Sequence, residues 1–451
     1  MRGKVIGGLV AAVLIAAVVW AVAASGGDDG GGDGDKASVR LWIMNNGPQP
    51  VADMRKTVKP FEEETGIDVK VELVGWDVQF DRIRNAAISG RGPDVTQAGT
   101  TQVPFFAALD GFEDLADRVG DIGGAEAYAD GVWATSGIEG QDAVFGIPWF
   151  TEARAIYYRK DALEAAGVDE ATAFADWDSF RSTLEALSEV KELDGETLIP
   201  FGSPGKQAFD LVHHVMPFVW SNGGAELSED ASTSTIASDE AVDAVKFIAD
   251  LLPAGLYDKT ALERDGTQVE ETFKGGRLAV WMGGPWVLAS TDREDDEAWT
   301  DAARQNVGIA PMPQGPTGEA ATFVGGSNLM VFKSSENKDE AWQLIEFLSQ
   351  DQTQTAYADL MGMFPARLDP QQAIGEQDEN YQAFFEAIQQ GRTYAAIPQW
   401  GQVENAYKTR FGNILDAAAG QGGGSYSREA IQAELQEAEK EANGLLEQDA
   451  G

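Results

Sequence analysis

The chain has 451 residues, and its 74 acidic and 33 basic side chains give a formal net charge of −41. This charge repels nucleic acids and anionic lipid headgroups, so neither is expected as a partner. The chain has no cysteine and two histidines, His213 and His214. Disulfides, thiolate zinc sites and cysteine nucleophiles are therefore excluded, and a Ser-His-Asp triad, a histidine-rich metal site or a bound cofactor is not expected.

The N-terminal segment 1–25 has the composition of an export signal or a membrane anchor. Arg2 and Lys4 precede an uncharged apolar run over 5–24. The run is long for a cleaved signal and long enough for a single span, so both interpretations stay open. The Gly/Asp-rich segment 26–37 should be a flexible tether. Because basic residues precede the run and acidic residues follow it, the main domain is expected outside the cytoplasm, secreted or anchored to the outer face of the cytoplasmic membrane.

The first part of the main domain alternates strands with helices. The pattern predicts strands at 39–44, 69–74 and 94–95, and helices at 51–65 and 78–89. Such alternation favours a parallel sheet with right-handed crossovers, whose ligands bind at the carboxyl ends of the strands. The loops at these ends contain the candidate contacts Asn46, Trp76, Gln97 and Thr101.

The stretch 140–161 contains two apolar segments joined by aromatic and charged side chains. The first segment runs into Pro148 and Trp149, Glu152 and Arg154 follow, and the second segment covers 155–158. Taken alone, this pattern fits an ordinary hairpin better than a crossing between two lobes.

The rest of the chain is mostly helical. The spacing of apolar residues predicts helices at 177–190, 209–220, 239–252, 269–274, 339–349, 381–390, 402–418 and 428–446, with strands at 278–282, 307–310 and 328–332. No repeat of 20–50 residues is present, which argues against a solenoid.

An ordered set of short motifs resembles the extracellular solute-binding proteins of ABC importers, specifically the sugar-binding family that includes maltose-binding protein. The resemblance covers nearly all of 38–446. Its segments, in order, are GPDV (92–95), GIP (146–148), YYRKD (157–161), WSNGG (220–224), FKGGRLAV (273–280), GPW (284–286), VGIAPMP (307–313), GGS (325–327), the helix 338–349 and the region of Pro398 and Trp400.

The resemblance implies an α/β fold with two lobes of the type II periplasmic-binding-protein class, joined by hinge crossings. Lobe 1 would comprise 38–148 and 307–354, and lobe 2 would comprise 149–306 and 355–451. The stretch 140–161 then becomes the first crossing, with a hinge at Pro148 and Trp149. A length of 451 residues is consistent with two such lobes.

The family's sugar contacts transfer to this chain unevenly. Glu152, nine residues before Asp161, matches the family's binding carboxylate, and Trp286 after Gly-Pro matches a stacking tryptophan. Trp400 falls near another stacking aromatic. Asn46 and Thr101 stand where maltose-binding protein has acids, and Ala98 where it has a stacking tryptophan, so maltose itself is in doubt.

Other candidate contacts have simpler alternatives. Trp76 and Trp220 are placed in the cleft, although a tryptophan more often packs in a core. Gly326 would bring backbone N–H groups to a ligand or form only a turn. Arg367 would reach the cleft rim or pair with surface acids.

The implied function is non-enzymatic: a receptor captures a mono- or oligosaccharide between its lobes and delivers it to the membrane subunits of an ABC permease. A monomer is expected. The alternatives are an exported glycosidase with paired carboxylates and the same fold binding glycerol-phosphate or another polar solute. The scarcity of basic residues near the candidate contacts disfavours a phosphate.

Overall fold

The computed structural model describes residues 37–206, 208, 210–291, 296–376 and 379–448. The candidate export signal or anchor, and all of the tether except Ala37, lie outside these residues. Within them, no helix has the length and apolar character that a membrane crossing requires.

The first sheet has six strands in the order β12-β4-β11-β3-β1-β2. Their bounds are β1 Ser38–Ile43, β2 Asp68–Leu73, β3 Val95–Gly99, β4 Ile147–Ala153, β11 Val324–Val331 and β12 Phe364–Pro365. Strand β1 pairs in parallel with β2 and β3, as predicted, whereas β11 runs antiparallel to both β3 and β4. The sheet is therefore mixed, and β11 begins four residues before the predicted strand.

The second sheet has four strands in the order β10-β5-β9-β8. Its strands are β5 Ala155–Arg159, β8 Ile199–Gly202, β9 Leu278–Gly283 and β10 Val307–Ala310, and a separate hairpin consists of β6 Glu192–Leu193 and β7 Glu196–Thr197. Only β8 and β9 pair in parallel within this sheet.

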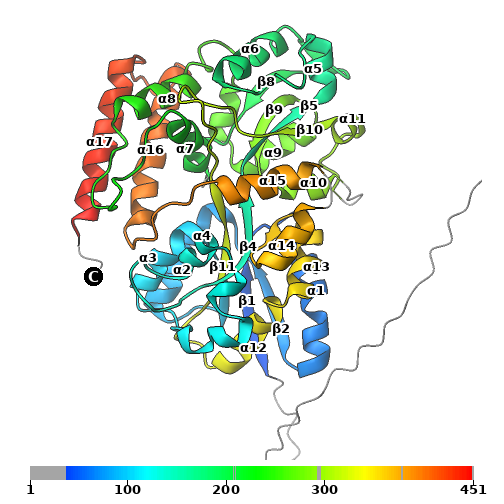
Figure 1. Ribbon diagram of the computed structural model, residues 1–451, viewed down its shortest axis with the longest axis vertical. Helices are drawn as coiled ribbons and strands as arrows, with labels where there is room; N and C mark the ends of the chain where they lie inside the picture. Colours follow the sequence, from blue (N-terminus) through cyan, green and yellow to red (C-terminus); the bar gives the residue numbers. More distant parts are fainter. Residues whose placement is uncertain (1–36, 207, 209, 292–295, 377–378, 449–451) are drawn as a thin grey trace, which may run out of the picture. The chain divides into compact units, whose positions relative to one another are not determined.

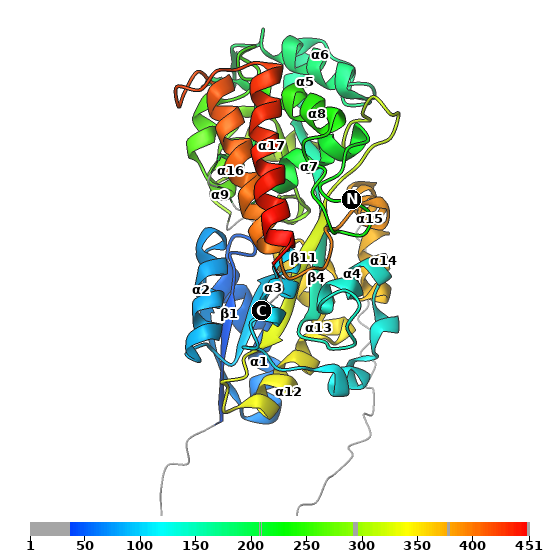
Figure 2. The same cartoon turned by 90° about the vertical axis from the view of Figure 1, so that its left-hand side faces the viewer.

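Helices cover both sheets (Figures 1 and 2). The helices in the first 190 residues are α1 Pro50–Thr65, α2 Trp76–Ser89, α3 Val103–Ala108, α4 Asp130–Trp133, α5 Lys160–Ala166 and α6 Trp177–Leu187. Those of the middle region are α7 Leu211–Ser221, α8 Asp239–Ala249, α9 Gly266–Lys274, α10 Trp286–Ser290 and α11 Asp301–Gln305. The later ones are α12 Lys338–Leu348, α13 Asp351–Met361, α14 Leu368–Gly375, α15 Glu379–Gln390, α16 Trp400–Ala418 and α17 Arg428–Leu446. Short 3₁₀ turns include η1 Thr100–Gln102 at the end of β3.

Local sequence sets where the helices begin and end. Helix α9, which carries several residues of the site described below, starts with a capping box in which Asp265 accepts from the backbone of Gln268 and the Gln268 side chain accepts from the backbone N–H of Asp265. Helix α1 starts with Pro50 in its first turn and ends at Gly66, whose φ of 75° is left-handed.

The chain passes from the first sheet to the second at Arg154, which alone separates β4 from β5. Pro148 and Trp149, the expected hinge, both lie inside β4. Asn328 of β11 pairs with Pro148, and the register shift next to it leaves Trp149 as an extra residue in the strand.

Two expected lobe boundaries also differ from the strand pairing. Strand β10 (307–310) was assigned to the first lobe, but it pairs with β5 in the four-stranded sheet, and the chain returns to the first sheet through 311–323. Helix α13 extends beyond the boundary at 354, yet it packs against α1 and β12 of the first half. Backbone hydrogen bonds and helix packing therefore move both boundaries along the chain.

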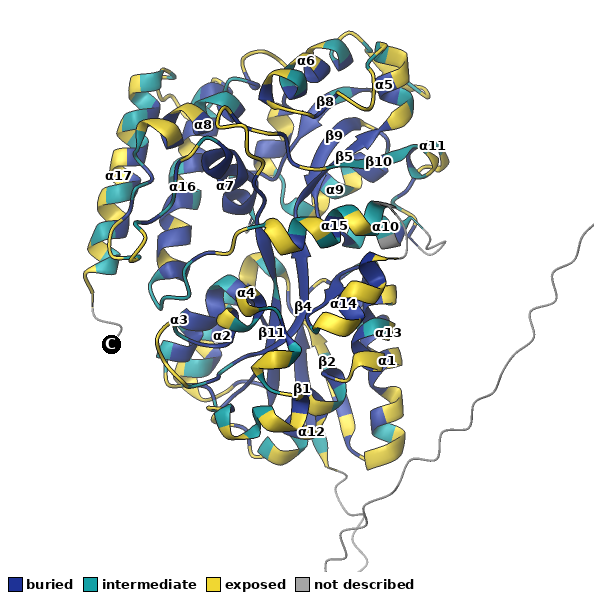
Figure 3. Cartoon of the chain, in the orientation of Figure 1, coloured by how far each residue is buried: buried dark blue, intermediate teal, exposed yellow. Residues whose placement is uncertain are grey.

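The inner strands of both sheets are almost wholly buried, whereas the edge strand β2 is mostly exposed, and many other exposed residues lie on the outer faces of the helices (Figure 3). In the second half, the Phe180 side chain is fully enclosed, and its ring lies 5.6 Å from that of Phe201 and 6.1 Å from that of Phe218. This aromatic cluster joins helices α6 and α7 to strand β8 and so fixes the back of the four-stranded sheet.

Replacing Phe180 with alanine should lower the free energy of unfolding by about 3–5 kcal/mol, because it removes buried apolar surface and leaves a cavity. Chemical denaturation measures this loss. The control is Ile88→Ala on α2, where the side chain is 68% exposed, and the change should stay within about 0.5 kcal/mol. Equal effects at the two positions would contradict the assignment of Phe180 to the core.

Candidate functional site

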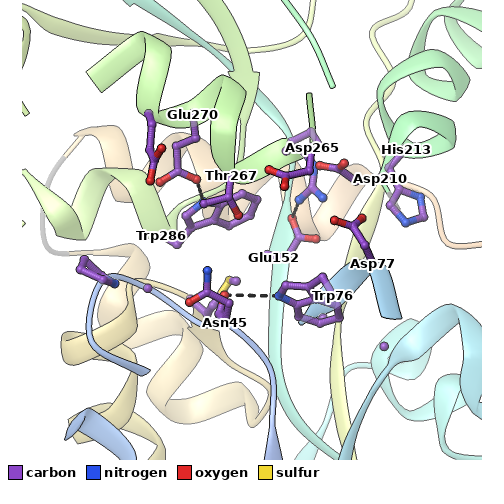
Figure 4. A pocket seen from close by; sticks show the side chains of 18 of the residues that line it. Asn45, Trp76, Asp77, Glu152, Asp210, His213, Asp265, Thr267, Glu270 and Trp286 are labelled. Carbon is purple, nitrogen blue, oxygen red and sulfur yellow. Dashed lines mark hydrogen bonds and ion pairs between the residues drawn. The ribbon is translucent and has the colours of Figure 1, made fainter. Parts of the chain in front are cut away.

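A cavity of about 590 Å³ lies where the two halves of the described chain meet. Figure 4 shows side chains from both halves around it: Asn45 and Trp76 from the first, Asp265, Glu270 and Trp286 from the second. Glu152 and Arg154 line it at the crossing, and Gly326 of β11 lines it beside them. The volume is typical of pockets that enclose small molecules.

Trp286 is held on the wall of the cavity by two charged groups. It begins α10 directly after β9 and the turn at Gly284 and Pro285, and any side chain at Gly284 would overlap its ring. The indole Nε1–H donates to Glu270 Oε2 at 2.7 Å, and the Arg154 guanidinium lies 4.9 Å from the ring centre. Lys274 Nζ in turn lies 2.6 Å from Glu270 Oε1. The tryptophan is therefore fixed in orientation before any ligand arrives.

A second tryptophan, Trp76, lies across the cavity in Figure 4. It is the first residue of α2, and its Nε1–H donates to the Asn45 carbonyl oxygen at 3.3 Å. The ring is partly exposed and lines the cavity, together with Thr101 from the η1 turn and the buried residue Phe150 from β4. Aromatic surface is thus contributed by both halves.

Glu152 and Arg154 form a nearly buried ion pair at the end of β4, with side chains 7% and 6% exposed. Burial raises the pKa of Glu152, and the charge of Arg154 and the hydrogen bond that it donates oppose that rise. Gly326 of the neighbouring strand β11 pairs with Thr151, the residue before Glu152. Its φ is 141° and a Cβ would overlap the carbonyl oxygen of Phe150, so only glycine fits there.

The first turns of α7 bring a carboxylate and a histidine to the cavity. Asp210 is partly buried, and its desolvation opposes ionisation, but the hydrogen bond with His214 and the nearby positive charge, including that of Arg154, together outweigh this and lower the pKa of Asp210. His214 Nε2 lies 3.4 Å from Asp210 Oδ2, and its Nδ1 lies 3.1 Å from Ser203 Oγ, a geometry that suits the neutral tautomer. Burial holds the pKa of His213 well below its usual value, so this cavity-lining ring is also neutral.

The lining is more acidic than the chain as a whole. Eight of its 28 residues carry carboxylates, whereas the chain has 74 in 451. They are Asp77, Glu152, Asp210, Asp265, Glu270, Glu271, Asp296 and Glu297. The two basic lining residues, Arg154 and Lys274, are both already in ion pairs. The cavity therefore offers hydrogen-bond acceptors readily and has little charge left to bind an anion. Among the described residues, no group of three side chains could hold a metal ion.

Five of the ten predicted contacts line this cavity: Trp76, Thr101, Glu152, Trp286 and Gly326. Two others are one layer too deep. Asn46 is buried and donates through Nδ2 to Gln97 Oε1 at 2.8 Å, while Gln97 Nε2 donates to Ser327 Oγ at 2.9 Å. The neighbouring residue Asn45 lines the cavity instead. Asn46 and Gln97 thus fix the strand ends behind the wall rather than forming it.

The other three predicted contacts have structural partners elsewhere. Trp220 donates Nε1–H to Glu226 at 2.7 Å, and Trp400 is fully enclosed with its ring stacked 4.3 Å from that of Tyr394. Arg367 pairs with Asp351 and donates to the Ile122 carbonyl oxygen at 2.5 Å. None of the three lines the cavity.

Several lining residues are not among the contacts predicted from the sequence. Arg154 is one of them: the sequence offers it as a salt-bridge partner of Glu152, two residues away, and not as a ligand contact. Asp265 and Gln268 have the spacing of a capping box, which predicts the start of α9 from the sequence. Glu270 lies on this helix. Asp210 and Asp77 follow no motif, so nothing in the sequence distinguishes them from other acids.

The fold and cavity agree with comparisons to known proteins. The family model described as bacterial extracellular solute-binding protein matches residues 46–355. The chain belongs to this family.

Relatives of this solute-binding protein cover most of its length. The diacetylchitobiose-binding protein of Streptomyces coelicolor is 27% identical over 388 residues, which is 83% of this chain and 85% of that protein. The structure of a solute-binding protein from Thermotoga lettingae bound with α-D-tagatose has a TM-score of 0.79 at 24% identity, covering 91% of this chain and all of that one. The maltose-bound MalE3 of T. maritima has a TM-score of 0.76 at 22% identity, covering 89% and 99%. The expected two-lobed periplasmic-binding fold is confirmed.

A buried carboxyl group behind the cavity should make stability depend on pH. Glu404 of α16 lies 3.5 Å from the Thr101 hydroxyl, and burial raises its pKa to about 8. The folded protein therefore keeps the Glu404 proton up to about pH 8, whereas the unfolded chain releases it near 4.5. Stability from this group is present below pH 4.5 and is lost as the pH rises toward 8.

Replacing Glu404 with glutamine should remove this dependence. Between pH 5 and pH 8, the unfolding free energy of the unaltered protein should fall relative to that of Glu404→Gln by on the order of 2–4 kcal/mol. Urea denaturation of both proteins at several pH values measures the difference. Parallel pH profiles would contradict it.

Proposed function

We propose that this protein is the extracellular sugar receptor of an ABC importer, which captures a mono- or oligosaccharide in the cavity and delivers it to the permease. The observation that carries this proposal is Trp286, whose ring is fixed on the cavity wall beside the polar pair of Glu152 and Arg154. A sugar has C–H groups on its faces and hydroxyls around its edge. An aromatic plane covers such a face, and carboxylates and guanidinium groups bind such an edge.

The composition of the cavity supports a neutral polyhydroxy ligand over a phosphate. Both basic lining residues are paired with carboxylates, so a phosphate would face a net negative wall. The same pairings argue against a glycosidase. Glu152, Asp210 and Glu270 each have a basic or histidine partner, rather than standing as an unpaired acid opposite a second carboxylate. We propose that the protein binds its ligand without chemical change.

The delivery mechanism follows from the two sheets. We propose lobe 1 as 37–153 with 324–376, and lobe 2 as 155–310 with 379–448, with rotation at Arg154 and in 311–323. A ligand that contacts both lobes shifts the population from open to closed, and this is the signal that a permease can read. The protein would act outside the cytoplasm as a monomer, held near the membrane if the segment 1–25 remains attached.

Thermal unfolding with a panel of maltose, maltotriose, N,N′-diacetylchitobiose and D-tagatose tests the ligand class. At least one of them should raise the melting temperature by several degrees at a concentration far above its Kd, because it binds only the folded protein. A melting temperature unchanged by all four would contradict the proposal.

Replacing Trp286 with alanine should weaken binding of the panel member that gives the largest shift by about 1–3 kcal/mol, because the stacking face is lost. Isothermal titration calorimetry measures the affinity. Trp342→Phe is the control, since Trp342 is a buried tryptophan of α12 outside the cavity. The affinity of this variant for the same sugar should stay within about twofold of that of the unaltered protein. An unchanged Kd for Trp286→Ala would remove this ring from the site.

A further inference from the structure

Arg154 occupies an unusual position for a buried cation. It is the single residue between β4 and β5, its side chain is 6% exposed, and it lines the cavity. A guanidinium in such a place costs free energy unless its N–H groups find acceptors. The partners of its individual nitrogen atoms therefore indicate what the residue is for.

The protein satisfies only part of this guanidinium. Nη1 donates to Glu152 Oε2. Within the described residues, Nε is enclosed without an acceptor, and Nη2 has no protein acceptor either but is not among the enclosed atoms. Nη2 therefore keeps accessible surface on a residue whose open side is the cavity.

Arg159, five residues further on, shows what a purely structural arginine looks like in the same chain. It is even more buried, at 1% side-chain exposure, and all three of its nitrogens have acceptors. Nε and Nη2 donate to the Asp161 carboxylate, Nη2 also donates to Asp194, and Nη1 donates to the Gly276 carbonyl oxygen at 3.2 Å. It does not line the cavity. Arg154 thus leaves an accessible donor, Nη2, unused within the described residues, whereas Arg159 leaves no nitrogen without an acceptor.

Glu152, the partner of Arg154, also accepts a hydrogen bond through only one of its two carboxylate oxygens within the described residues. Glu152 Oε2 accepts from Arg154, whereas Oε1 has no donor within the described chain and is not among the enclosed atoms. The pair therefore presents one unused donor, Nη2, next to one unused acceptor, Oε1. The same guanidinium lies over the Trp286 ring, 4.9 Å from its centre, so this donor–acceptor pair adjoins the aromatic ring and leaves the opposite face of the ring for a sugar.

We infer that Arg154 is a ligand-binding and specificity-determining residue that acts with Glu152 on two neighbouring hydroxyl groups of a sugar stacked on Trp286. Arg154 Nη2 donates to one hydroxyl oxygen, and Glu152 Oε1 accepts the proton of the next hydroxyl. Hydroxyls suit this pair because each both donates and accepts, whereas an anionic group would meet the Glu152 carboxylate. The inference rests on the proposed sugar-binding function.

The test replaces Arg154 with methionine, which keeps much of the side-chain volume and removes every donor. The probe is the panel sugar that most raises the melting temperature of the unaltered protein, and calorimetry gives its Kd. Arg154→Met should weaken binding about ten- to a hundredfold, as expected for losing a hydrogen bond from a charged group. Arg154→Lys keeps a positive charge but lacks the planar guanidinium, so its Kd should lie between those of the unaltered protein and Arg154→Met.

A second pair of variants separates binding from folding. The double variant Glu152→Gln with Arg154→Met removes both buried charges, so it should fold with a melting temperature at or above that of the unaltered protein and still bind weakly. Arg159→Met is the matched control. It should lower the melting temperature because it removes the hydrogen bonds that the buried guanidinium donates to Asp161, Asp194 and the Gly276 carbonyl oxygen, and its Kd for the sugar should stay within twofold.

The outcomes distinguish this inference from the function on which it rests. Weakened binding by the folded double variant together with unchanged affinity in Arg159→Met would establish the role of Arg154. Sugar binding by the unaltered protein, with affinity within twofold in Arg154→Met and in the double variant, would overturn the inference and leave the proposed function standing. Failure of every panel sugar to bind the unaltered protein would overturn the proposed function, and the inference with it.

Discussion

The passage of the chain between its two sheets at Arg154 is the constraint on which the site depends. Because one residue separates β4 from β5, the ends of two sheets are brought within a side chain's reach of each other. Glu152 lies near the end of β4 in the first sheet, and Trp286 follows β9 of the second sheet. Both side chains contact the guanidinium of Arg154. The cavity is a consequence of this joint, since neither sheet encloses it alone.

Buried cations recur in this acidic chain, and each lies among carboxylates. Lys274 is held between Glu270 and Asp296, and Arg159 between Asp161 and Asp194. Such pairs contribute little net stability because desolvation offsets their attraction. Their value is directional: removal of either partner leaves an uncompensated charge, so the geometry around them is strongly held. Of the three cations Lys274, Arg159 and Arg154, it is Arg154, which lines the cavity, whose hydrogen bonding is least complete.

The sequence specified the secondary structure well, because long helices such as 428–446 and buried strands such as 307–310 carry strong periodic patterns. It specified the site less well. Neighbouring residues of an extended chain face opposite ways. Asn45 therefore lines the cavity, whereas the predicted contact, Asn46, lies behind the cavity wall. Trp400 has the sequence context of a stacking residue, but its partner is Tyr394, a contact that only the tertiary structure creates. The lobe limits depended on which strand β10 pairs with, which no local pattern encodes.

Gly326 has a consequence for how this cavity can change its preferences during evolution. At that point the wall is peptide backbone, since its left-handed conformation and the nearby Phe150 carbonyl oxygen exclude every larger residue. Trp76 and Trp286, by contrast, stand at the beginnings of helices where other side chains could be accommodated. The part of the cavity wall at Gly326 therefore cannot change by substitution, whereas the parts at Trp76 and Trp286 can. New ligand preferences in a lineage of such proteins should arise by exchange at these helix starts while the strand beneath them stays the same.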